Sequence, residues 1–278
     1  MSMLKIFFIL VDWFKRLTGK QLLYITPNKY NGLGKTAVWC DLGFWYVGNI
    51  YDSADIAYGI AQNGVVEEAD TSLVLDVLSN LKSKYENITV YDIGANTGYY
   101  SILSATKFGA SVHAFEPLEE YVTCISESAR INGVTNRVTA HRMALGSKKA
   151  TIEITLSGSG STLTKDFLGQ SDLPTRMVPV ETLDSLGLPA PHFIKIDVEA
   201  HEWEVLRGAQ MIISKYKPVC FIEVARTFSD RNFVHPHFAD IMAFFDKQGY
   251  KIERNTSEGL VSLKEIPDGV SMYLCTPK

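Results

Sequence analysis

Three polar residues with acid–base chemistry follow an apolar run that ends near residue 196. They are Asp197, Glu199 and His201. Asp197 and Glu199 are two residues apart, so an extended backbone would point both carboxylates the same way. A helix amino terminus disfavours imidazolium, which would keep His201 neutral and able to accept a proton. We expect these three residues to form a catalytic group, and the sequence leaves open which of them is the general base.

A divalent metal is an alternative to a protein base. Asp197 and Glu199, with Glu223 at the end of the next expected strand, could hold a cation that acidifies a hydroxyl directly. The sequence assigns no residue firmly to a metal, so this stays a secondary hypothesis. His235 and His237 flank a proline and have no third ligand nearby other than Asp240, so we expect a surface turn there.

A second group of residues lies where a β-branched and aromatic stretch passes into a helical one. It consists of Asp92, Gly94, Asn96 and Gly98. Gly94 can adopt backbone angles closed to other residues and lets a ligand approach the main chain. Gly98 is expected to let the helix pack close to the strand. This turn predicts a site for a nucleotide-like cofactor.

The spacing to the next acidic strand end adds to this prediction. Glu116 lies 22 residues after Gly94, at the end of a strand expected over 110–115. A carboxylate at that place can accept hydrogen bonds from two ribose hydroxyls. Pro117 suits the first turn of the following helix, where a missing N–H costs nothing. Glu116 and Pro117 are therefore expected to line the cofactor site.

The form of the turn distinguishes between cofactors. Dinucleotide sites use G-x-G-x-x-G to bring backbone N–H groups to a pyrophosphate, whereas this chain has D-x-G-x-N-x-G. The Asp92 carboxylate would repel a phosphate and attract an ammonium group. S-adenosylmethionine carries a ribose, an adenine and an amino-acid tail but no phosphate. The sequence therefore favours this methyl donor.

The rest of the chain alternates strands with helices. Strands are expected over 88–93, 110–115, 137–142, 150–156, 176–180, 192–197, 218–224, 249–254 and 269–275. Helices are expected over 71–84, 98–108, 118–131, 201–214 and 236–248. This order predicts an α/β fold with a Rossmann-like doubly wound sheet. The serine- and glycine-rich stretch 156–163 interrupts it as a lid or a flexible linker.

Six motifs together resemble the FkbM family of S-adenosylmethionine-dependent methyltransferases. They are DIGANTG (92–98), FEP (115–117), ALG (144–146), VETLD (180–184), IKIDVEAHE (194–202) and VLRGA (205–209). The resemblance implies a class I methyltransferase fold and adds Ala144 to the cofactor site. It also implies O-methylation of a hydroxyl of a sugar, glycan, lipid or natural product. One departure is Ala200, where the family pattern D-V-E-G-x-E has glycine, and a positive φ there would strain alanine.

Two other function classes stay open. An NAD-dependent oxidoreductase would use the same acid at the second strand, and a catalytically silent binding module could share the fold. Nucleic acid is not an expected partner, because the main domain is acidic and gives little attraction for phosphates. We expect a small-molecule or glycan acceptor.

Length and composition suit one globular enzyme domain with an extension. The 278 residues are 46% hydrophobic and carry a net charge of −4. We expect an amino-terminal arm over 1–36, an aromatic-rich segment with a lead-in helix over 37–85, and a methyltransferase domain over 86–278. The aromatic segment is expected to be mainly core. Four widely separated cysteines suggest neither disulfides nor a zinc site, so we expect a cytoplasmic protein.

The arm differs in charge from the rest of the chain. Residues 1–36 carry a net charge of +5, and residues 3–17 combine apolar and basic side chains. Their uncharged run over 6–11 is too short to cross a bilayer. We expect this segment to pack on the domain or on a second copy in a homo-oligomer. Peripheral contact with a membrane surface is the alternative.

Overall fold

The structure is a computed structural model that describes residues 35–164, 167–169, 172–228, 233–263 and 268–278. The membrane-contact segment 3–17 and almost all of the arm lie outside these residues. The chain forms two compact units that divide between Val66 and Glu67. The lead-in helix thus groups with the larger unit, while the three-part division at 36 and 85 stays a prediction. No helix of the described residues is long and apolar enough to cross a membrane.

The smaller unit contains a hairpin and one helix. Strands β1 (Thr36–Cys40) and β2 (Phe44–Gly48) pair antiparallel, and helix α2 (Ile56–Asn63) follows them. Asp55 caps this helix by accepting a hydrogen bond from the Ala57 N–H. Phe44 and Tyr46 are fully buried, so much of the aromatic segment is core, although Tyr51 is exposed.

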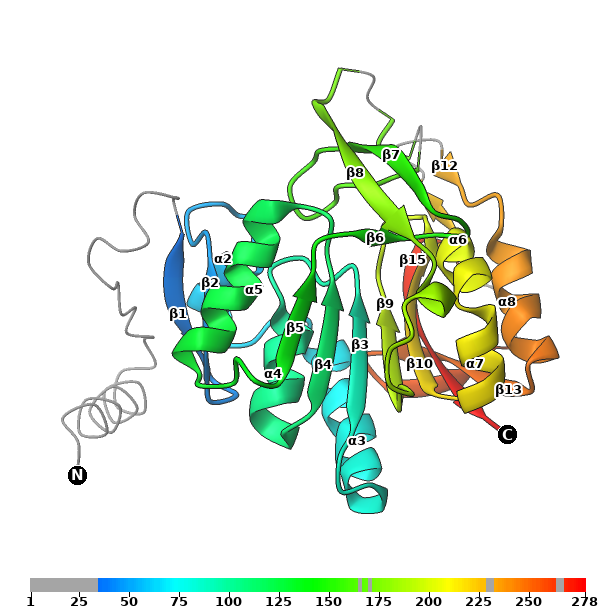
Figure 1. The fold of residues 1–278 in the computed structure, drawn as a ribbon, viewed down its shortest axis with the longest axis horizontal. Helices are drawn as coiled ribbons and strands as arrows, with labels where there is room; N and C mark the ends of the chain where they lie inside the picture. Colours follow the sequence, from blue (N-terminus) through cyan, green and yellow to red (C-terminus); the bar gives the residue numbers. More distant parts are fainter. Residues whose placement is uncertain (1–34, 165–166, 170–171, 229–232, 264–267) are drawn as a thin grey trace. The chain divides into compact units, whose positions relative to one another are not determined.

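The larger unit is built on a mixed sheet of eight strands. Figure 1 shows its parallel strands side by side. Its order is β14-β13-β15-β10-β9-β3-β4-β5. The strands β5, β4, β3, β9 and β10 pair parallel to one another. From β10 onward each strand pairs antiparallel with the next, in the order β10, β15, β13 and β14. Their bounds are β3 (Thr89–Ile93), β4 (Ser111–Phe115), β5 (Val138–His141), β9 (Phe193–Ile196), β10 (Val219–Ala225), β13 (Tyr250–Thr256), β14 (Gly259–Ser262) and β15 (Val270–Pro277). The predicted doubly wound α/β fold is confirmed.

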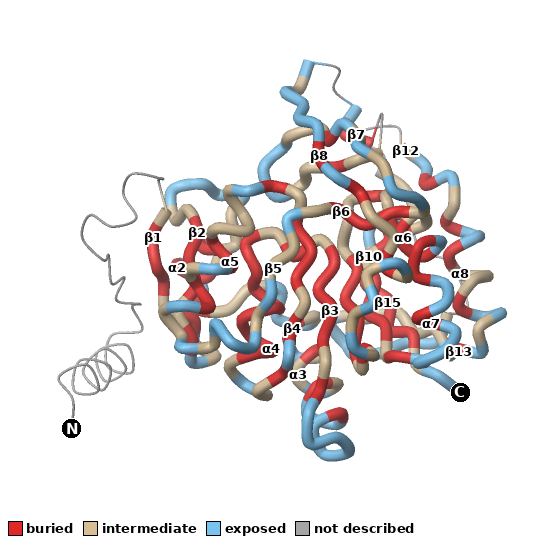
Figure 2. The backbone as a smooth tube through the Cα atoms, viewed as in Figure 1, coloured by how far each residue is buried: buried red, intermediate tan, exposed pale blue. Residues whose placement is uncertain are grey.

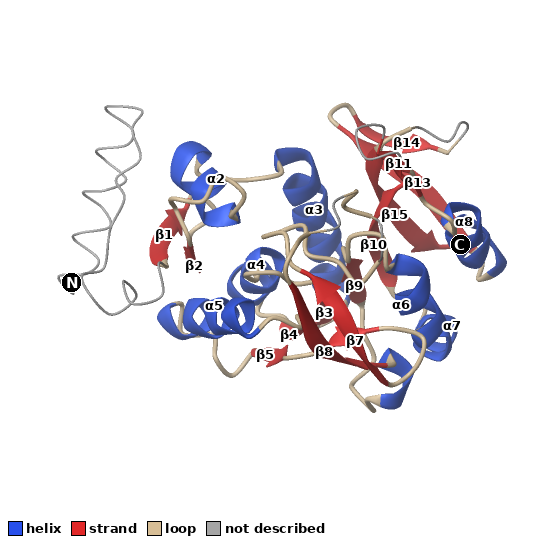
Figure 3. Ribbon diagram, turned by 90° about the horizontal axis from the view of Figure 1, so that it is seen from above, coloured by secondary structure: helices blue, strands red, loops and turns tan. Residues whose placement is uncertain are grey.

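Helices cover both faces of this sheet (Figure 3). One face carries α3 (Glu68–Lys84), α4 (Tyr99–Phe108) and α5 (Glu119–Ile131). The other carries the short helix η2 (Leu183–Ser185), α6 (Glu202–Gly208), α7 (Gln210–Tyr216) and α8 (Phe238–Lys247). The helix predicted over 201–214 is thus two helices, which meet at Ala209.

Alternation along the central strands separates two kinds of contact. Tyr91 and Ile93 of β3 face the large apolar core under α6, α7 and α8. Asp92, between them, contacts Ser101 of α4 on the opposite face. Figure 2 shows the parallel strands as the buried centre of this unit. Polar side chains at the carboxyl ends of β3 and β9 are therefore held by a rigid frame.

Two predicted strands lie outside the central sheet. The segments β7 (Ala150–Thr155) and β8 (Thr175–Glu181) form a three-stranded sheet with β6 (Ala144–Leu145), in the order β6-β8-β7. Their strand character was predicted correctly, but placing them in one continuous doubly wound sheet was wrong. From Met177 to Val180 of β8, exposed and buried residues alternate, as they do in a sheet with one solvated face. A small hairpin of β11 (Thr227–Phe228) and β12 (Phe233–Val234) follows β10.

Candidate active site

The glycine turn after β3 is shaped by its neighbours in the sheet. Gly94 has φ of 77°, and a Cβ atom placed on it would lie 1.7 Å from the carbonyl oxygen of Asp197. Gly94 is thus required by both its conformation and the close approach of the chain that follows β9. Gly98 has φ of 93° and packs against Ile125 of α5. The contact that leaves no room for a side chain at Gly98 is thus with α5, and α4 also packs against β3 and β4.

Glu116 at the end of β4 is joined to this turn. One carboxylate oxygen accepts a hydrogen bond from the Asn96 N–H at 3.0 Å, and the other accepts one from the Leu118 N–H at 2.9 Å. The residue is 6% exposed, and burial raises its pKa to about 8 although both N–H groups oppose this. Each oxygen retains a further lone pair, so the carboxylate can still accept from ribose hydroxyls.

Pro117 lies next to Glu116, whereas Ala144 lies in the separate three-stranded sheet. Pro117 precedes Leu118, which is the N-cap of α5, so Pro117 lies before the helix and not in its first turn as predicted. Ala144 is buried in β6, where it pairs with Val180 of β8. No contact links Ala144 to the glycine turn among the interactions of the described residues, and its role in the cofactor site stays a prediction.

Asp92 is a buried carboxylate at the centre of the sheet. Its Oδ2 atom accepts a hydrogen bond from the Ser101 hydroxyl at 2.6 Å, while Oδ1 is buried and has no hydrogen-bond partner. Burial raises the pKa of Asp92, and the nearby Lys195 ammonium opposes that rise. An acceptor atom left unsatisfied in the interior is costly, which suits a place kept for function.

Lys195 supplies a buried positive charge close to the carboxylates of Asp92 and Asp197. It pairs across the sheet with Asp92, and its Nζ atom donates to Asp197 Oδ2 at 2.8 Å. Burial alone would lower the pKa of Lys195, but the carboxylates of Asp197, Asp92 and Glu67 outweigh burial and raise it. This ion pair fixes the side chain of Asp197.

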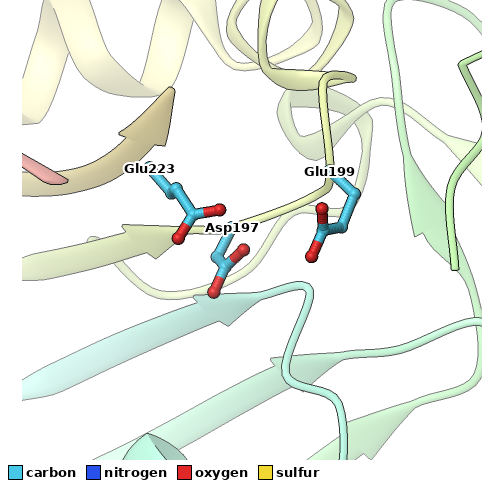
Figure 4. A group of neighbouring side chains, drawn as sticks. All are labelled: Asp197, Glu199 and Glu223. Carbon is cyan, nitrogen blue, oxygen red and sulfur yellow. The ribbon is translucent and has the colours of Figure 1, made fainter. Parts of the chain in front are cut away.

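Three carboxylates converge at the ends of β9 and β10 (Figure 4). One oxygen from each of Asp197, Glu199 and Glu223 lies within 4.8 Å of the others. Burial, together with the charges of Asp197 and Glu199, raises the pKa of Glu223 well above its ordinary value. The group can therefore share a proton or surround a cation, and the Lys195 ammonium already compensates part of its charge.

The turn that presents Glu199 is left-handed. Glu199 has φ of 53° and Ala200 has φ of 70°, so the positive φ anticipated for Ala200 is present. Such angles cost a residue with a Cβ about 1 kcal/mol or more. Two hydroxyl groups bind the turn, because Thr162 donates to the carbonyl oxygen of Glu199 and Thr164 donates to that of Ala200.

A buried pair of side chains also holds this turn. The Ala200 N–H donates to Glu202 Oε1 at 2.9 Å, and His235 Nε2 lies 3.1 Å from Glu202 Oε2. The His237 N–H donates to His235 Nδ1, so Nε2 must carry the ring proton and donate it to Glu202. His235 is 4% exposed, and the surface turn expected around it is wrong at this residue.

His201 is not brought into the carboxylate group. A Cβ atom on Gly146, which follows β6, would lie 3.5 Å from His201 Nε2. That nitrogen is buried without a hydrogen-bond partner, and burial lowers the pKa of the ring. His201 is thus neutral, as expected, but its Nε2 lies beside Gly146.

The serine- and glycine-rich segment lies against the site. Asn96 Nδ2 donates to the carbonyl oxygen of Ser159 at 3.4 Å, and a Cβ atom on Gly160 would lie 4.0 Å from Glu199 Oε1. The segment therefore contacts both the glycine turn and the carboxylate group. This placement agrees with the lid interpretation of 156–163.

Comparison with known proteins places this arrangement in a family. The model of the Methyltransferase FkbM domain matches residues 92–252, which is more than half of the chain and contains the glycine turn and the carboxylate group. The chain belongs to the FkbM methyltransferase family. It is therefore a methyltransferase by family.

One curated relative is the hexuronic acid methyltransferase AglP of Haloferax volcanii. It is 28% identical to this FkbM chain over 129 residues, which are 46% of the chain and 52% of the relative. The match thus spans about half of the relative's length.

Two solved structures are also similar to this FkbM chain. The FkbM methyltransferase from Methylobacillus flagellatus has 18% identity and a TM-score of 0.46, and the match covers 68% of this chain and 43% of that one. A TehB-like SAM-dependent methyltransferase from Corynebacterium glutamicum has 9% identity and a TM-score of 0.44, with 80% and 94% covered.

Sequence reasoning missed several residues of this FkbM site. The Lys195 Nζ atom lies over the ring of Tyr100, 4.8 Å from the ring centroid. The Tyr100 hydroxyl donates a hydrogen bond to Glu67 at 2.6 Å. The partnership of Glu202 with His235 joins residues 33 apart. Neither contact follows from a local motif. The sequence shows only a tyrosine in the helix after the glycine turn and a histidine expected in a surface turn.

Proposed function

We propose that this protein is an S-adenosylmethionine-dependent O-methyltransferase acting on a sugar hydroxyl. The observation that carries the proposal is the junction of a buried ribose-type carboxylate, Glu116, with a positive-φ glycine turn beside a carboxylate group. Family membership gives the methyltransferase class. The archaeal relative is named as a hexuronic acid methyltransferase, which supports a sugar as the acceptor.

The residues present suit this methyl donor. Glu116 would hold the ribose, and Gly94 with Asn96 would lie against the donor through the main chain of the turn. The unsatisfied Oδ1 atom of Asp92 would accept a hydrogen bond from the amino-acid part. When bound, S-adenosylmethionine supplies a methyl group activated by its sulfonium. The protein must then orient the acceptor and remove its proton.

Glu199 is the residue we propose as the proton acceptor. It is presented by the left-handed turn, whereas Asp197 is held by its ion pair with Lys195. A carboxylate with other carboxylates beside it binds a proton more readily than an isolated one, because the neighbouring negative charges favour its neutral form. His201 is the less favoured base, because its Nε2 atom is buried beside Gly146.

A cation at the carboxylate group is the alternative activation. We expect transfer to persist in EDTA, because the Lys195 ammonium already pairs with Asp197 and would repel a second cation. Activity lost in EDTA and restored by Mg²⁺ would favour the metal hypothesis instead.

Transfer of a labelled methyl group tests the proposal. The full chain would be incubated with methyl-labelled S-adenosylmethionine and uronic-acid or neutral glycosides, and the products analysed by mass spectrometry. We expect Glu199→Gln to lower kcat by about 100-fold or more, in the range of general-base contributions. His201→Gln should change kcat only a few-fold.

Binding of S-adenosylhomocysteine provides the control, because both variants should keep the affinity of the unaltered protein in calorimetry. Loss of transfer in His201→Gln with full activity in Glu199→Gln would reverse the assignment. Absence of both S-adenosylhomocysteine binding and methyl transfer would refute the proposed function.

A further inference from the structure

One oxygen of Asp92 has no partner although an ammonium group lies close to this carboxylate. Asp92 and Lys195 are directly paired residues of the parallel strands β3 and β9, so their side chains lie on the same face of the sheet. Both are buried, with 1% and 4% of the residue exposed. Lys195 Nζ nevertheless donates to Asp197 Oδ2 at 2.8 Å, and Asp92 Oδ1 accepts no hydrogen bond. Because an unpaired buried oxygen is costly, this arrangement requires a group that holds the ammonium at Asp197.

Tyr100 is that group. The Lys195 Nζ atom lies over its ring, and Tyr100 is 5% exposed. The face of an aromatic ring carries a negative potential, and it attracts a cation most strongly where water is excluded. The Tyr100 ring and the Asp197 carboxylate therefore hold the ammonium together, while Asp92 Oδ1 stays unpaired.

The ring of Tyr100 is itself held from two sides. Tyr100 lies in the first turn of α4, directly before Ser101, whose hydroxyl donates to Asp92 Oδ2 at 2.6 Å. At the other end of the side chain, the Tyr100 hydroxyl donates to Glu67 Oε2 at 2.6 Å. The helix and this hydrogen bond fix the ring, so the flexible lysine side chain has to follow the ring.

We propose that Tyr100 is a positioning residue for the methyl donor. It keeps the Lys195 ammonium on Asp197, and Asp92 Oδ1 thereby stays open for the ammonium of the donor's amino-acid part. This inference rests on the proposed function and adds to it the residue that keeps the donor's carboxylate partner free. Without the ring, the remaining N–H donors of Lys195 reach Asp92 Oδ1 and compete with the donor for it.

Two ligands that differ in the amino-acid part test this role. S-adenosylhomocysteine carries that part and 5′-methylthioadenosine lacks it, whereas both contain the adenosine and a thioether. The dissociation constants of both for the full chain would be measured by calorimetry. We expect Tyr100→Leu to weaken binding of S-adenosylhomocysteine about tenfold, as the loss of one hydrogen bond between charged groups implies. Binding of 5′-methylthioadenosine should not change, and Tyr100→Phe, which keeps the ring face, should retain both affinities.

Tyr250→Leu is the matched control. Tyr250 is also a buried tyrosine, its hydroxyl donates to the Pro218 carbonyl oxygen, and the Lys217 Nζ atom lies 5.6 Å from its ring centroid. This variant thus removes the same side chain from a second lysine–tyrosine pair, which lies away from Asp92. It should bind both ligands as the unaltered protein does.

Fluorinated phenylalanines at position 100 separate the charge of the ring from its volume. Fluorine weakens the negative face of the ring and leaves its shape almost unchanged, so these variants create no cavity and decide the question even where Tyr100→Leu does not fold. We expect the affinity for S-adenosylhomocysteine to fall from phenylalanine to pentafluorophenylalanine, with 5′-methylthioadenosine unaffected.

Three results would overturn the inference: unchanged affinity for S-adenosylhomocysteine in Tyr100→Leu, equal losses for both ligands, or constant affinity across the fluorinated series. Failure of the proposed function is detected separately, because the unaltered protein would then bind neither ligand.

Discussion

Glu199 and Ala200 combine a strained backbone with a position at the carboxylate group. Their positive φ angles are held by Thr162, Thr164 and the Glu202 carboxylate. Strain of this kind persists only where the surroundings over-determine it, and it is concentrated at functional sites. The buried chain of hydrogen bonds from His237 through His235 to Glu202 is directional, because each member has a fixed donor or acceptor role.

Glu202→Gln should disturb this chain, because its amide keeps one oxygen and turns an NH2 donor toward either the Ala200 N–H or the His235 Nε2–H. We expect about 1–3 kcal/mol of stability to be lost and kcat to fall, with little change in S-adenosylhomocysteine affinity. Ala200→Gly should restore part of both losses in the double variant, because glycine adopts a positive φ without strain.

The measurement is a double-mutant cycle on unfolding free energy and kcat. Ala200→Gly alone should change stability by less than about 1 kcal/mol, since lost strain and lost rigidity offset each other. Strict additivity of the two substitutions would show that Glu202 does not act through the turn.

Glu223 should give the reaction a pH dependence. Its raised pKa means that it is protonated below that pKa and gains a negative charge as pH rises through it. The added charge increases the proton affinity of the neighbouring Glu199, so we expect kcat to rise with pH above the ordinary range of carboxylates. Glu223→Gln stays neutral and should remove this rise.

The comparison is a pH–rate profile from about pH 5 to 9 for the unaltered protein and Glu223→Gln. Glu153→Gln on the exposed face of β7 is the control and should leave the profile unchanged. An identical profile for Glu223→Gln would contradict this role.

The elements β3 and β9 place the site by approaching each other at Gly94. A methyl group at Gly94 would clash with the Asp197 carbonyl oxygen. The backbone of Gly94 and that of Asp197 follow two paired parallel strands, so neither can move away easily. The glycine turn is thus a packing requirement between two strands as well as an approach for the cofactor.

Gly94→Ala should therefore destabilise the protein far more than its φ alone implies. Gly133→Ala is the matched control, because Gly133 has φ of 70° and nothing within 4 Å of an added Cβ atom. We expect about 1 kcal/mol from Gly133→Ala and more than about 3 kcal/mol, or failure to fold, from Gly94→Ala. Denaturant unfolding measures both losses, and equal losses would disprove the packing argument.

The larger unit contains every residue of the proposed donor site and of the carboxylate group. Donor binding should thus stabilise the folded chain by mass action. At 100 times its dissociation constant, S-adenosylhomocysteine should add about 2.7 kcal/mol to the free energy of unfolding. NAD should add nothing, because the Asp92 carboxylate beside the glycine turn would repel a pyrophosphate.

Thermal or denaturant unfolding with each ligand checks this expectation. Glu116→Gln should lose much of the stabilisation by S-adenosylhomocysteine, since its amide replaces one of the two carboxylate acceptors. Glu120→Gln, in the first turn of α5 and in a surface ion pair with Arg176, should keep it. Stabilisation by NAD alone would support the oxidoreductase alternative.

The sequence by itself determined the central strands, the glycine turn and the acidic strand ends. Their signals are local, because alternation, glycine and the 22-residue spacing from Gly94 to Glu116 lie within one βαβ unit. The same local patterns located Asp197 and Glu199 and led to the family. They also predicted β7 and β8 as strands, but could not show that these strands form a separate sheet.

Only the tertiary structure decided which of these groups meet. It brought Glu223 to Asp197 and Glu199, placed Lys195 between three carboxylates, buried His235 against Glu202 and turned His201 Nε2 toward Gly146. The physical reason is that such contacts depend on strand order and on backbone angles. Strand order joins β10 to β9 across many residues of sequence, and the angles at Glu199 and Ala200 run against local preference.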